Sequence, residues 1–166
     1  DLFMKKYGEA EWGYKKAEEP EQPVESEAPE ADASLVALMD KIYGDKKDIM
    51  VGQTVLYNGM GADGTTQPLT WYLGTEDVKF EAGLASEAMI SSQAHSIVLL
   101  RMPEGADMEA AKAKIAESID PFKWVCVGVN PDKVRVESNG NLICVVLDDE
   151  NGDYYADNFL SFAVAE

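Results

Sequence analysis

WVCVGVNPDKVRVESNGNLICVVLDD, residues 124–149, is the stretch that decides the fold of this chain. Val134 and Val136 alternate with charged residues at the two-residue period of a half-buried strand. Asn139-Gly140 predicts a tight type I′ turn in which both residues have positive φ, and the return segment 142–147 is apolar at every position. A strand of that kind needs cover on both faces. The stretch therefore predicts a β-hairpin whose second strand lies inside a larger sheet.

The remaining residues read as strands and helices around this hairpin. Three further extended segments are expected: 51–57, 78–90 with a break near Gly83, and 97–102. Four helices are expected: from an N-cap at Ser34 to Gly44, then 69–73, 107–120 and 154–164. The fold class that follows is α+β, with a small antiparallel sheet and helices packed on it.

Two consequences for packing follow from these patterns. The segments 97–102 and 142–147 are apolar on both sides, so both faces of the sheet must be covered. The first helix, the N-terminal segment and a second copy of the chain are the candidates for the second cover. Lys133 and Arg135, on the first hairpin strand, are expected to point outward. The closing helix is expected to bury Tyr155, Phe159, Phe162 and Ala163.

Composition divides the chain into a tail and linker over residues 1–33 and a single α+β domain over residues 34–166. The segment Glu18–Asp32 is rich in Glu, Pro, Ser and Ala, and predicts an extended, self-repelling acidic linker. Two interpretations of the segment before it stay open: a peptide that docks on a groove or a neighbouring molecule, or part of a longer membrane-proximal region. Its large apolar residues are Leu2, Phe3, Met4, Tyr7, Trp12 and Tyr14.

The net charge is −17, from 31 acidic and 14 basic residues. Nucleic-acid binding draws on basic patches, so nucleic acid is excluded as an expected partner. The same charge opposes adsorption to an anionic bilayer. No apolar run approaches the roughly 20 residues of a membrane span, and no transmembrane segment is expected in this chain. The simplest meaning of the charge is solubility, and a surface for cations or a basic partner is the alternative.

No motif predicts a catalytic residue, a cofactor or a metal site. His95 is the only histidine, with serines at positions 91, 92 and 96. Side chains this close along an extended segment do not converge into a triad, and no G-x-S-x-G elbow is present, so a polar residue at the start of a strand is expected. The acidic run Asp148–Asp153 fails the EF-hand template, because alignment of its glycine on Gly152 puts Leu147 in the first ligand position. A solvated turn and a helix N-terminus are expected there.

Aromatic residues and cysteines leave alternatives open. Trp71, Tyr72 and Trp124 are a candidate ligand platform for a sugar or a peptide, with a place in the core or at its rim as the alternative. Cys126 and Cys144 either form a cross-strand disulfide or, as we prefer, are two buried small hydrophobic residues.

Three stretches carry a resemblance to a known family: TWYLGTEDVKFEAGLASEAM, HSIVLLRMPEGADMEAAKAKI and the opening hairpin stretch. Their order resembles the bacterial domain-of-unknown-function family 4358 over about residues 69–149. Members are mostly small exported proteins or lipoproteins of Gram-positive gut bacteria. The resemblance implies an extracellular chain attached to the cell membrane by an N-terminal lipid anchor. It implies no activity and assigns no catalytic residues.

The function expected from the sequence is a surface domain that binds or scaffolds and does not catalyse. Its expected partner is an extracellular protein or a glycan, with a homodimer as a further option. The competing hypothesis is a small hydrolase of cell-wall or sugar substrates that uses carboxylates near the loop between Tyr57 and Trp71. A clustered pair of buried acids in an open cleft would favour the hydrolase.

Overall fold

The computed structural model describes residues 30–46, 50–62, 64, 66–90, 93–124 and 127–162. In this part of the chain, five strands form one sheet in the order β1-β2-β3-β5-β4, and all neighbours are antiparallel. The strands are β1 (Val51–Leu56), β2 (Ala82–Ala88), β3 (Ser96–Arg101), β4 (Arg135–Asn139) and β5 (Leu142–Leu147). The return strand of the hairpin, β5, lies between β3 and β4, as its apolar sequence predicts.

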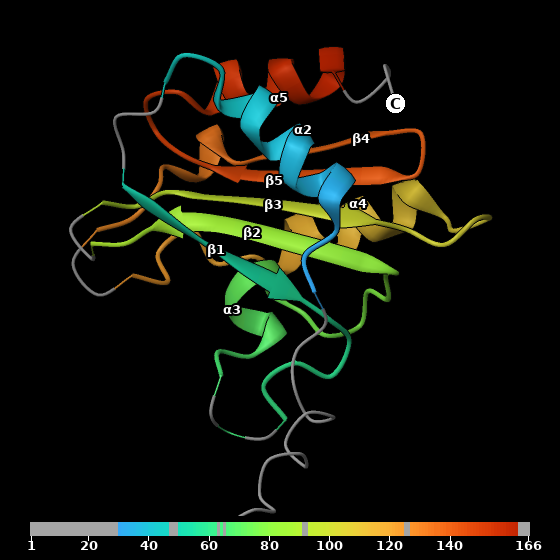
Figure 1. The fold of residues 1–166 in the computed structure, drawn as a ribbon. Helices are drawn as coiled ribbons and strands as arrows, with labels where there is room; N and C mark the ends of the chain where they lie inside the picture. Colours follow the sequence, from blue (N-terminus) through green and yellow to red (C-terminus); the bar gives the residue numbers. More distant parts are fainter. Residues whose placement is uncertain are drawn as a thin grey trace, which may run out of the picture.

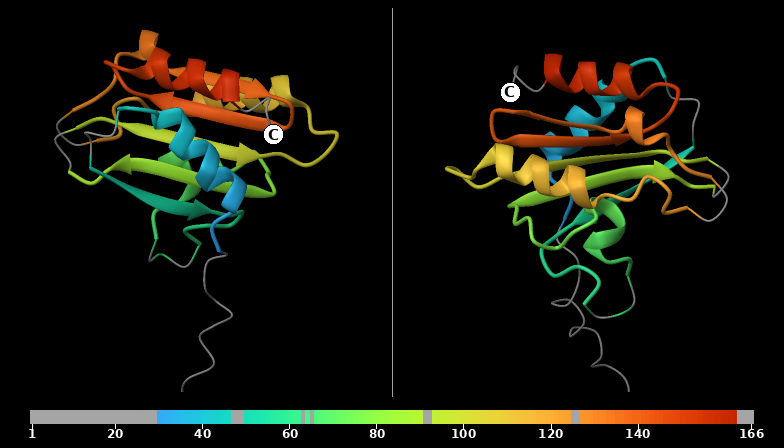
Figure 2. Two further views of the ribbon diagram at one scale, coloured as in Figure 1. Left: turned by 45° about the horizontal axis from the view of Figure 1, so that its top comes forward. Right: turned by 180° about the vertical axis from the view of Figure 1, so that it is seen from behind.

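Helices cover both faces of this sheet (Figures 1 and 2). The helices are α2 (Ala33–Tyr43), α3 (Leu69–Leu73), α4 (Met108–Ser118) and α5 (Gly152–Phe162), with a 3₁₀ turn, η3, at Pro131–Lys133. The first helix, α2, packs beside α5 on one face, and α3 and α4 lie on the other. The α+β prediction is confirmed, and the cover that the apolar strands require on both faces comes from helices of the same chain.

Alternation along the strands divides the core into two layers. In β3, Ile97 and Leu99 face α2 and α5, whereas Val98 and Leu100 face α3 and α4. The six residues of β5, Leu142–Leu147, also alternate: the three even-numbered residues face α2 and α5, and the three odd-numbered residues face α3 and α4. All six of these β5 side chains are buried. A two-residue period in a strand without polar positions produces two cores, one on each side of the sheet.

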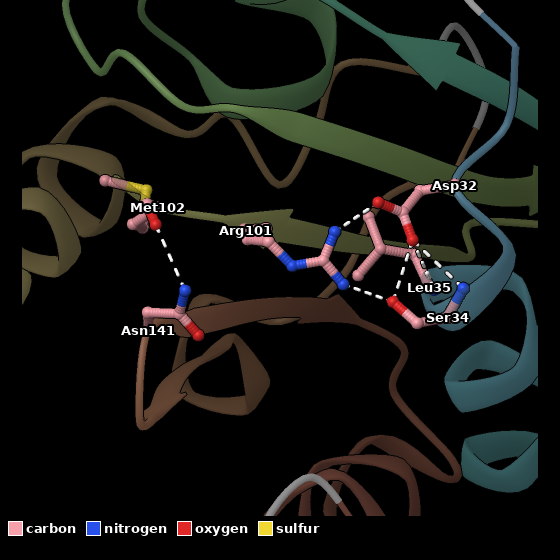
Figure 3. Close-up of polar contacts among 6 residues, drawn as sticks. All are labelled: Asp32, Ser34, Leu35, Arg101, Met102 and Asn141. Carbon is pink, nitrogen blue, oxygen red and sulfur yellow. Dashed lines mark hydrogen bonds and ion pairs between the residues drawn. The ribbon is translucent and has the colours of Figure 1, made fainter. Parts of the chain in front are cut away.

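The start of α2 differs from the prediction. Asp32, and not Ser34, is the N-cap: its Oδ1 accepts hydrogen bonds from the backbone amides of Ser34 and Leu35. The guanidinium of Arg101, at the end of β3, binds Asp32 and Ser34 (Figure 3). Burial alone would raise the pKa of Asp32, but the hydrogen bonds from Arg101, Ser34 and Leu35 lower it to about 2. An ionised cap therefore ties α2 to the central strand.

Two glycine positions correct the sequence reading. The hairpin turn is Gly140-Asn141, since Asn139 pairs with Leu142, and Gly140 alone has a positive φ, 61°. A positive φ only at the first central residue belongs to a type II′ turn and not to type I′. Gly83 does not break β2 but lies within it, and a Cβ there would stand 2.9 Å from Leu56 Cβ. Close packing of β1 explains this glycine.

Three other predictions have mixed outcomes. Lys133 is exposed, whereas Arg135 is only a quarter exposed and pairs with Glu137 and with two acids of α5. Phe162 is 39% exposed and does not join the buried stripe of α5. Ala163, Cys126 and the N-terminal tail lie outside the described residues. Helices α3 and α4 agree with the prediction, with Gly74 closing α3 and Asp107 capping α4.

Candidate functional site

One end of the sheet carries the chemistry-bearing residues of the described chain. β2 ends there at Ala88, β3 begins there at Ser96, and β5 ends there at Leu147 (Figure 1). Two polar pairs of neighbouring residues, Ser86-Glu87 and His95-Ser96, stand on these central strands or directly beside them. Because neighbours point to opposite faces, each pair sends one side chain into each layer.

On the face of α2 and α5, the buried side chains form a chain of hydrogen bonds. His95 Nδ1 lies 2.7 Å from Asp148 Oδ2, His95 Nε2 lies 2.7 Å from the Tyr43 hydroxyl, and that hydroxyl lies 2.7 Å from Ser86 Oγ. An ionised Asp148 only accepts, so Nδ1 carries a proton. In the neutral imidazole, Nε2 then accepts from Tyr43, whose oxygen accepts from Ser86. We call these four residues the Tyr43 network.

The carboxylate at the end of this network also builds the start of α5. Asp148 Oδ1 accepts from the backbone amides of Glu150 and Asn151, at 2.9 and 2.7 Å. Burial acts to raise the pKa of Asp148, but the hydrogen bonds from His95 and from these amides outweigh it and lower that pKa. Burial raises the pKa of Tyr43, so its hydroxyl stays protonated at neutral pH. The ring of Tyr155 packs edge-on against both Tyr43 and His95.

The Tyr43 network has the order of an acid–imidazole–hydroxyl relay but not the access. His95 is 1% exposed, Ser86 is fully buried, and both imidazole nitrogens are already bonded. A hollow of about 250 Å³ borders His95 and Asp148 from the side of Gly128 and Glu150. A substrate in this hollow would meet a closed hydrogen-bond chain and not a free nucleophile. The arrangement holds α2, the sheet and α5 together.

The acidic run before α5 serves the same structural purpose. Asp148 is buried, so the prediction of a solvated turn is wrong at this residue, while the prediction of a helix N-terminus is confirmed. Asp149 accepts a hydrogen bond from the backbone amide of Asn130, and Asp153 pairs with Arg135. Within the described ranges, no three His, Cys, Asp or Glu side chains gather to hold a metal ion.

On the face of α3 and α4, an ammonium group lies among aromatic rings. Lys123 Nζ is 4.7, 5.4 and 5.0 Å from the ring centroids of Trp71, Tyr72 and Trp124. It also donates to Glu87 Oε2 at 2.6 Å and to the carbonyl of Trp71 at 2.7 Å. Trp71 Nε1 donates to the other oxygen of Glu87. We call these five residues the Lys123 cluster.

The structure thus brings together the three aromatic residues of the predicted platform, around a lysine that the sequence did not single out. Tyr72 and Trp124 are buried, and the Lys123 side chain is 5% exposed. Burial lowers the pKa of Lys123, and Glu87 opposes that shift. Ammonium groups bind aromatic faces by cation–π attraction, so the ring faces are already occupied. Whether the three rings also bind a ligand stays a prediction.

Ser96 completes this end of the α3 and α4 face. It is the cross-strand partner of Glu87, so alternation places its side chain on the same face as the Lys123 cluster. It is 1% exposed, and its Oγ is the one buried side-chain polar atom without a hydrogen-bond partner in the described part of the chain. His95 and Ser96, which are neighbours in sequence, therefore belong to different faces and cannot act together.

Exposed apolar side chains gather at the same end. Met50, Met89 and Ile90 are 67%, 64% and 50% exposed. Met50 and Met89 are joined by a backbone hydrogen bond of 2.9 Å, and Ile90 follows directly. We call these three residues the apolar rim. Phe122, 59% exposed, precedes Lys123 and so lies at this end too.

In the described part of the predicted hydrolase region there is a hollow, but its acids are not paired and buried, and Asp63, the acid of the loop itself, lies outside the described residues. A hollow of about 300 Å³ beside Tyr57 is lined by Glu30, Asp32 and Glu81 among others. Glu30 and Glu81 are exposed, and Asp32 is engaged by Arg101. A carboxyl with a pKa of about 2 is ionised at neutral pH and cannot serve as a general acid. These carboxylates therefore do not form the buried pair that a hydrolase would need.

Of the two cysteines, only Cys144 lies in the described part of the chain. Cys144 is a buried, free cysteine on the layer of α2 and α5, and burial raises the pKa of its thiol. This agrees with the interpretation of Cys144 as a small hydrophobic residue. Its suggested partner lies outside the described residues.

Comparison of the chain with protein-family models, with curated proteins and with solved structures finds no match. The resemblance to family 4358 therefore remains a prediction from the quoted stretches. No helix in the described ranges is both long enough and apolar enough to cross a bilayer.

Proposed function

We propose that this chain is an exported domain, held outside the cell by an N-terminal lipid anchor, that binds a partner protein and performs no catalysis. The observation that carries the proposal is the apolar rim: Met50, Met89 and Ile90 are at least half exposed and adjoin one another at one end of the sheet. Exposed apolar side chains that gather at one place mark interaction sites more often than scattered ones do.

The chemistry of this end favours a protein over a glycan as the partner. Sugars bind on open aromatic faces, but the rings of Tyr72 and Trp124 are buried around Lys123. The exposed side chains are thioether, aliphatic and phenyl groups, which pack against apolar side chains of a protein. A net charge of −17 favours a basic partner and raises the rate of its association.

Binding without catalysis is the best-supported role because the polar groups at this end are engaged internally. The Tyr43 network is closed at His95, and the ammonium and carboxylate of the Lys123 cluster bind each other. The export and anchoring parts of the proposal rest on the family resemblance and on the acidic, proline-rich segment before Ser34.

The test is a binding measurement on cells of the bacterium that encodes the chain. Tagged full-length protein is added to intact cells from which the gene has been deleted, and bound protein is measured by flow cytometry. We expect the Met50→Ser/Met89→Ser/Ile90→Ser variant to bind at least tenfold less than the parent, whereas Phe162→Ser, at another exposed site, binds like the parent. Equal binding by the rim variant would contradict the proposal.

The proposed export is tested separately, by the access of an external protease to the domain on intact cells. In cells that express the natural gene, protease added outside should remove the domain, while a cytoplasmic marker survives. Protection of the domain until the cells are lysed would overturn the proposed location. A lipobox cysteine in the codons upstream of Asp1 is the expected source of the anchor.

A further inference from the structure

We propose that the chain carries its own ligand for the apolar rim: the aromatic segment of residues 1–17 docks on Met50, Met89 and Ile90 of the same molecule. Three observations carry this inference: the exposure of the rim, the position at which the described chain begins, and the charge of the segment. It shares a surface with the proposed function but does not depend on an outside partner.

The three apolar side chains of the rim are largely exposed to solvent. Met50 and Met89 are about two-thirds exposed, and Ile90 is half exposed. The Met89 side chain lies near Gly52 of β1, since a Cβ on Gly52 would be 3.5 Å from Met89 Cγ. β1 is an edge strand of the described sheet, and no other described strand lies beyond it on that side. The rim can accept large side chains without any rearrangement of the sheet.

The described chain begins, at Glu30, close enough to the rim for residues 1–17 to reach it. Glu30 lines the same hollow as Leu56, the last residue of β1, and the rim lies at the other end of that strand. Six residues of strand span about 17–20 Å. A linker of 12 residues, the number from Glu18 to Pro29, spans about 20 Å on average even in the case of a random coil, and acidic, proline-rich linkers span more. Docking therefore needs no strained linker.

Charge and composition favour this occupant. Residues 1–17 hold four lysines and three acids, a net charge of +1, which leaves −18 on the remainder of the chain. The segment also holds the six large apolar residues from Leu2 to Tyr14. A second copy would bring another −17 to the same surface. Linkage through one chain raises the effective concentration of the segment to the millimolar range, which suffices for a weak contact.

The test uses the full chain labelled with 5-fluorotryptophan. Its three tryptophans give three ¹⁹F resonances, and Trp12 is assigned with a Trp12→Phe variant. We expect the Trp12 resonance to differ from that of a synthetic peptide of residues 1–17 and to return to the peptide position in Met89→Ser/Ile90→Ser. The Phe162→Ser variant should leave it in place. Unchanged Trp71 and Trp124 resonances verify that each variant is folded.

Three results would overturn the inference. Trp12 could resonate at the free-peptide position in the parent protein, which would mean that the segment does not dock. Its resonance could be shifted but insensitive to the rim variant, which would place the contact elsewhere. It could return to the peptide position on dilution while sedimentation detects a dimer, which would make a second copy the occupant. Cell binding by the rim variant is measured independently of the Trp12 resonance, so failure of this inference and failure of the proposed function can be told apart.

Discussion

The two faces of the sheet carry polar clusters of different construction at the same end. On the α2 and α5 face, the Tyr43 network pairs every one of its polar side chains. On the α3 and α4 face, the Lys123 cluster holds its charge between rings and a carboxylate, while the Ser96 hydroxyl beside it has no hydrogen-bond partner among the described residues. The first cluster therefore joins α2, the sheet and α5 through hydrogen bonds between uncharged and charged groups, whereas the second holds an ammonium–carboxylate pair among rings and leaves the neighbouring Ser96 hydroxyl outside its hydrogen bonds. The charged and polar groups of both clusters are largely buried, whereas the side chains of the apolar rim, our proposed binding surface, are at least half exposed.

The largest expected effect comes from the removal of Asp148. Asp148→Ala deprives His95 of its carboxylate and the start of α5 of its cap, so the free energy of unfolding should fall by about 3 kcal/mol or more. Urea denaturation followed by circular dichroism measures it. Asp153→Ala, which removes an exposed acid of α5, is the control and should cost under about 1 kcal/mol. Equal costs would mean that the network contributes no more than a surface ion pair.

In the Lys123 cluster, loss of one charge should lower the free energy of unfolding more than loss of both charges together. Lys123→Met leaves Glu87 mostly buried without its cation and should cost about 2–3 kcal/mol. Lys123→Met combined with Glu87→Gln removes both charges, keeps an acceptor for Trp71 Nε1, and should recover most of the loss. Chemical denaturation of the parent, of Lys123→Met, of Glu87→Gln and of the double variant completes the cycle. A double variant as unstable as the sum of the singles would contradict the pairing.

The Tyr43 network also predicts a dependence on pH. The pKa of Asp148 is lower in the folded protein than its usual value of 3.8, so the stability it contributes is present in full only well above that value, from about pH 5, and is lost as pH falls through the folded pKa. The difference in unfolding free energy between the parent and Asp148→Ala should therefore shrink as pH falls below about 5. Denaturation series at several pH values measure it. A constant difference would refute the assignment.

The smallest expected effects have opposite signs on the two faces. Ser86→Ala takes a partner from Tyr43 and should lower stability by about 1 kcal/mol. Ser96→Ala removes a buried hydroxyl for which the described part of the chain offers no partner, and should leave stability unchanged or raise it by up to about 1 kcal/mol. Thermal melting of both variants decides between the signs. A loss for Ser96→Ala equal to that for Ser86→Ala would indicate a partner for the Ser96 hydroxyl.

The sheet and its helices could be predicted from sequence because their signals are local. Six consecutive apolar residues in β5 indicate a strand covered on both faces, and the spacing in α4 indicates one buried stripe. The turn at Gly140 could not be assigned to its type, because Asn-Gly fits two registers that differ by one residue. The cap at Asp32 was missed because the serine two places later fits the same signature.

The polar clusters could not be predicted in the same way. The Tyr43 network joins residues 43, 86, 95 and 148, and no local pattern relates them. The aromatic residues at 71, 72 and 124 were singled out together, but Lys123 reads as an ordinary surface lysine until the fold brings it to Glu87. A lysine directly before a tryptophan in an acidic chain is the one available signal, and it is weak.

We propose that the two clusters are structural and that the apolar rim is the binding surface, and one binding experiment compares these roles directly. Cell binding is measured for the parent, for Met50→Ser/Met89→Ser/Ile90→Ser, and for Lys123→Met/Glu87→Gln, each shown to be folded. We expect at least a tenfold loss for the rim variant and binding within twofold of the parent for the cluster variant. Loss of binding in the cluster variant, with the rim variant unaffected, would contradict these roles and make the aromatic cluster the ligand site.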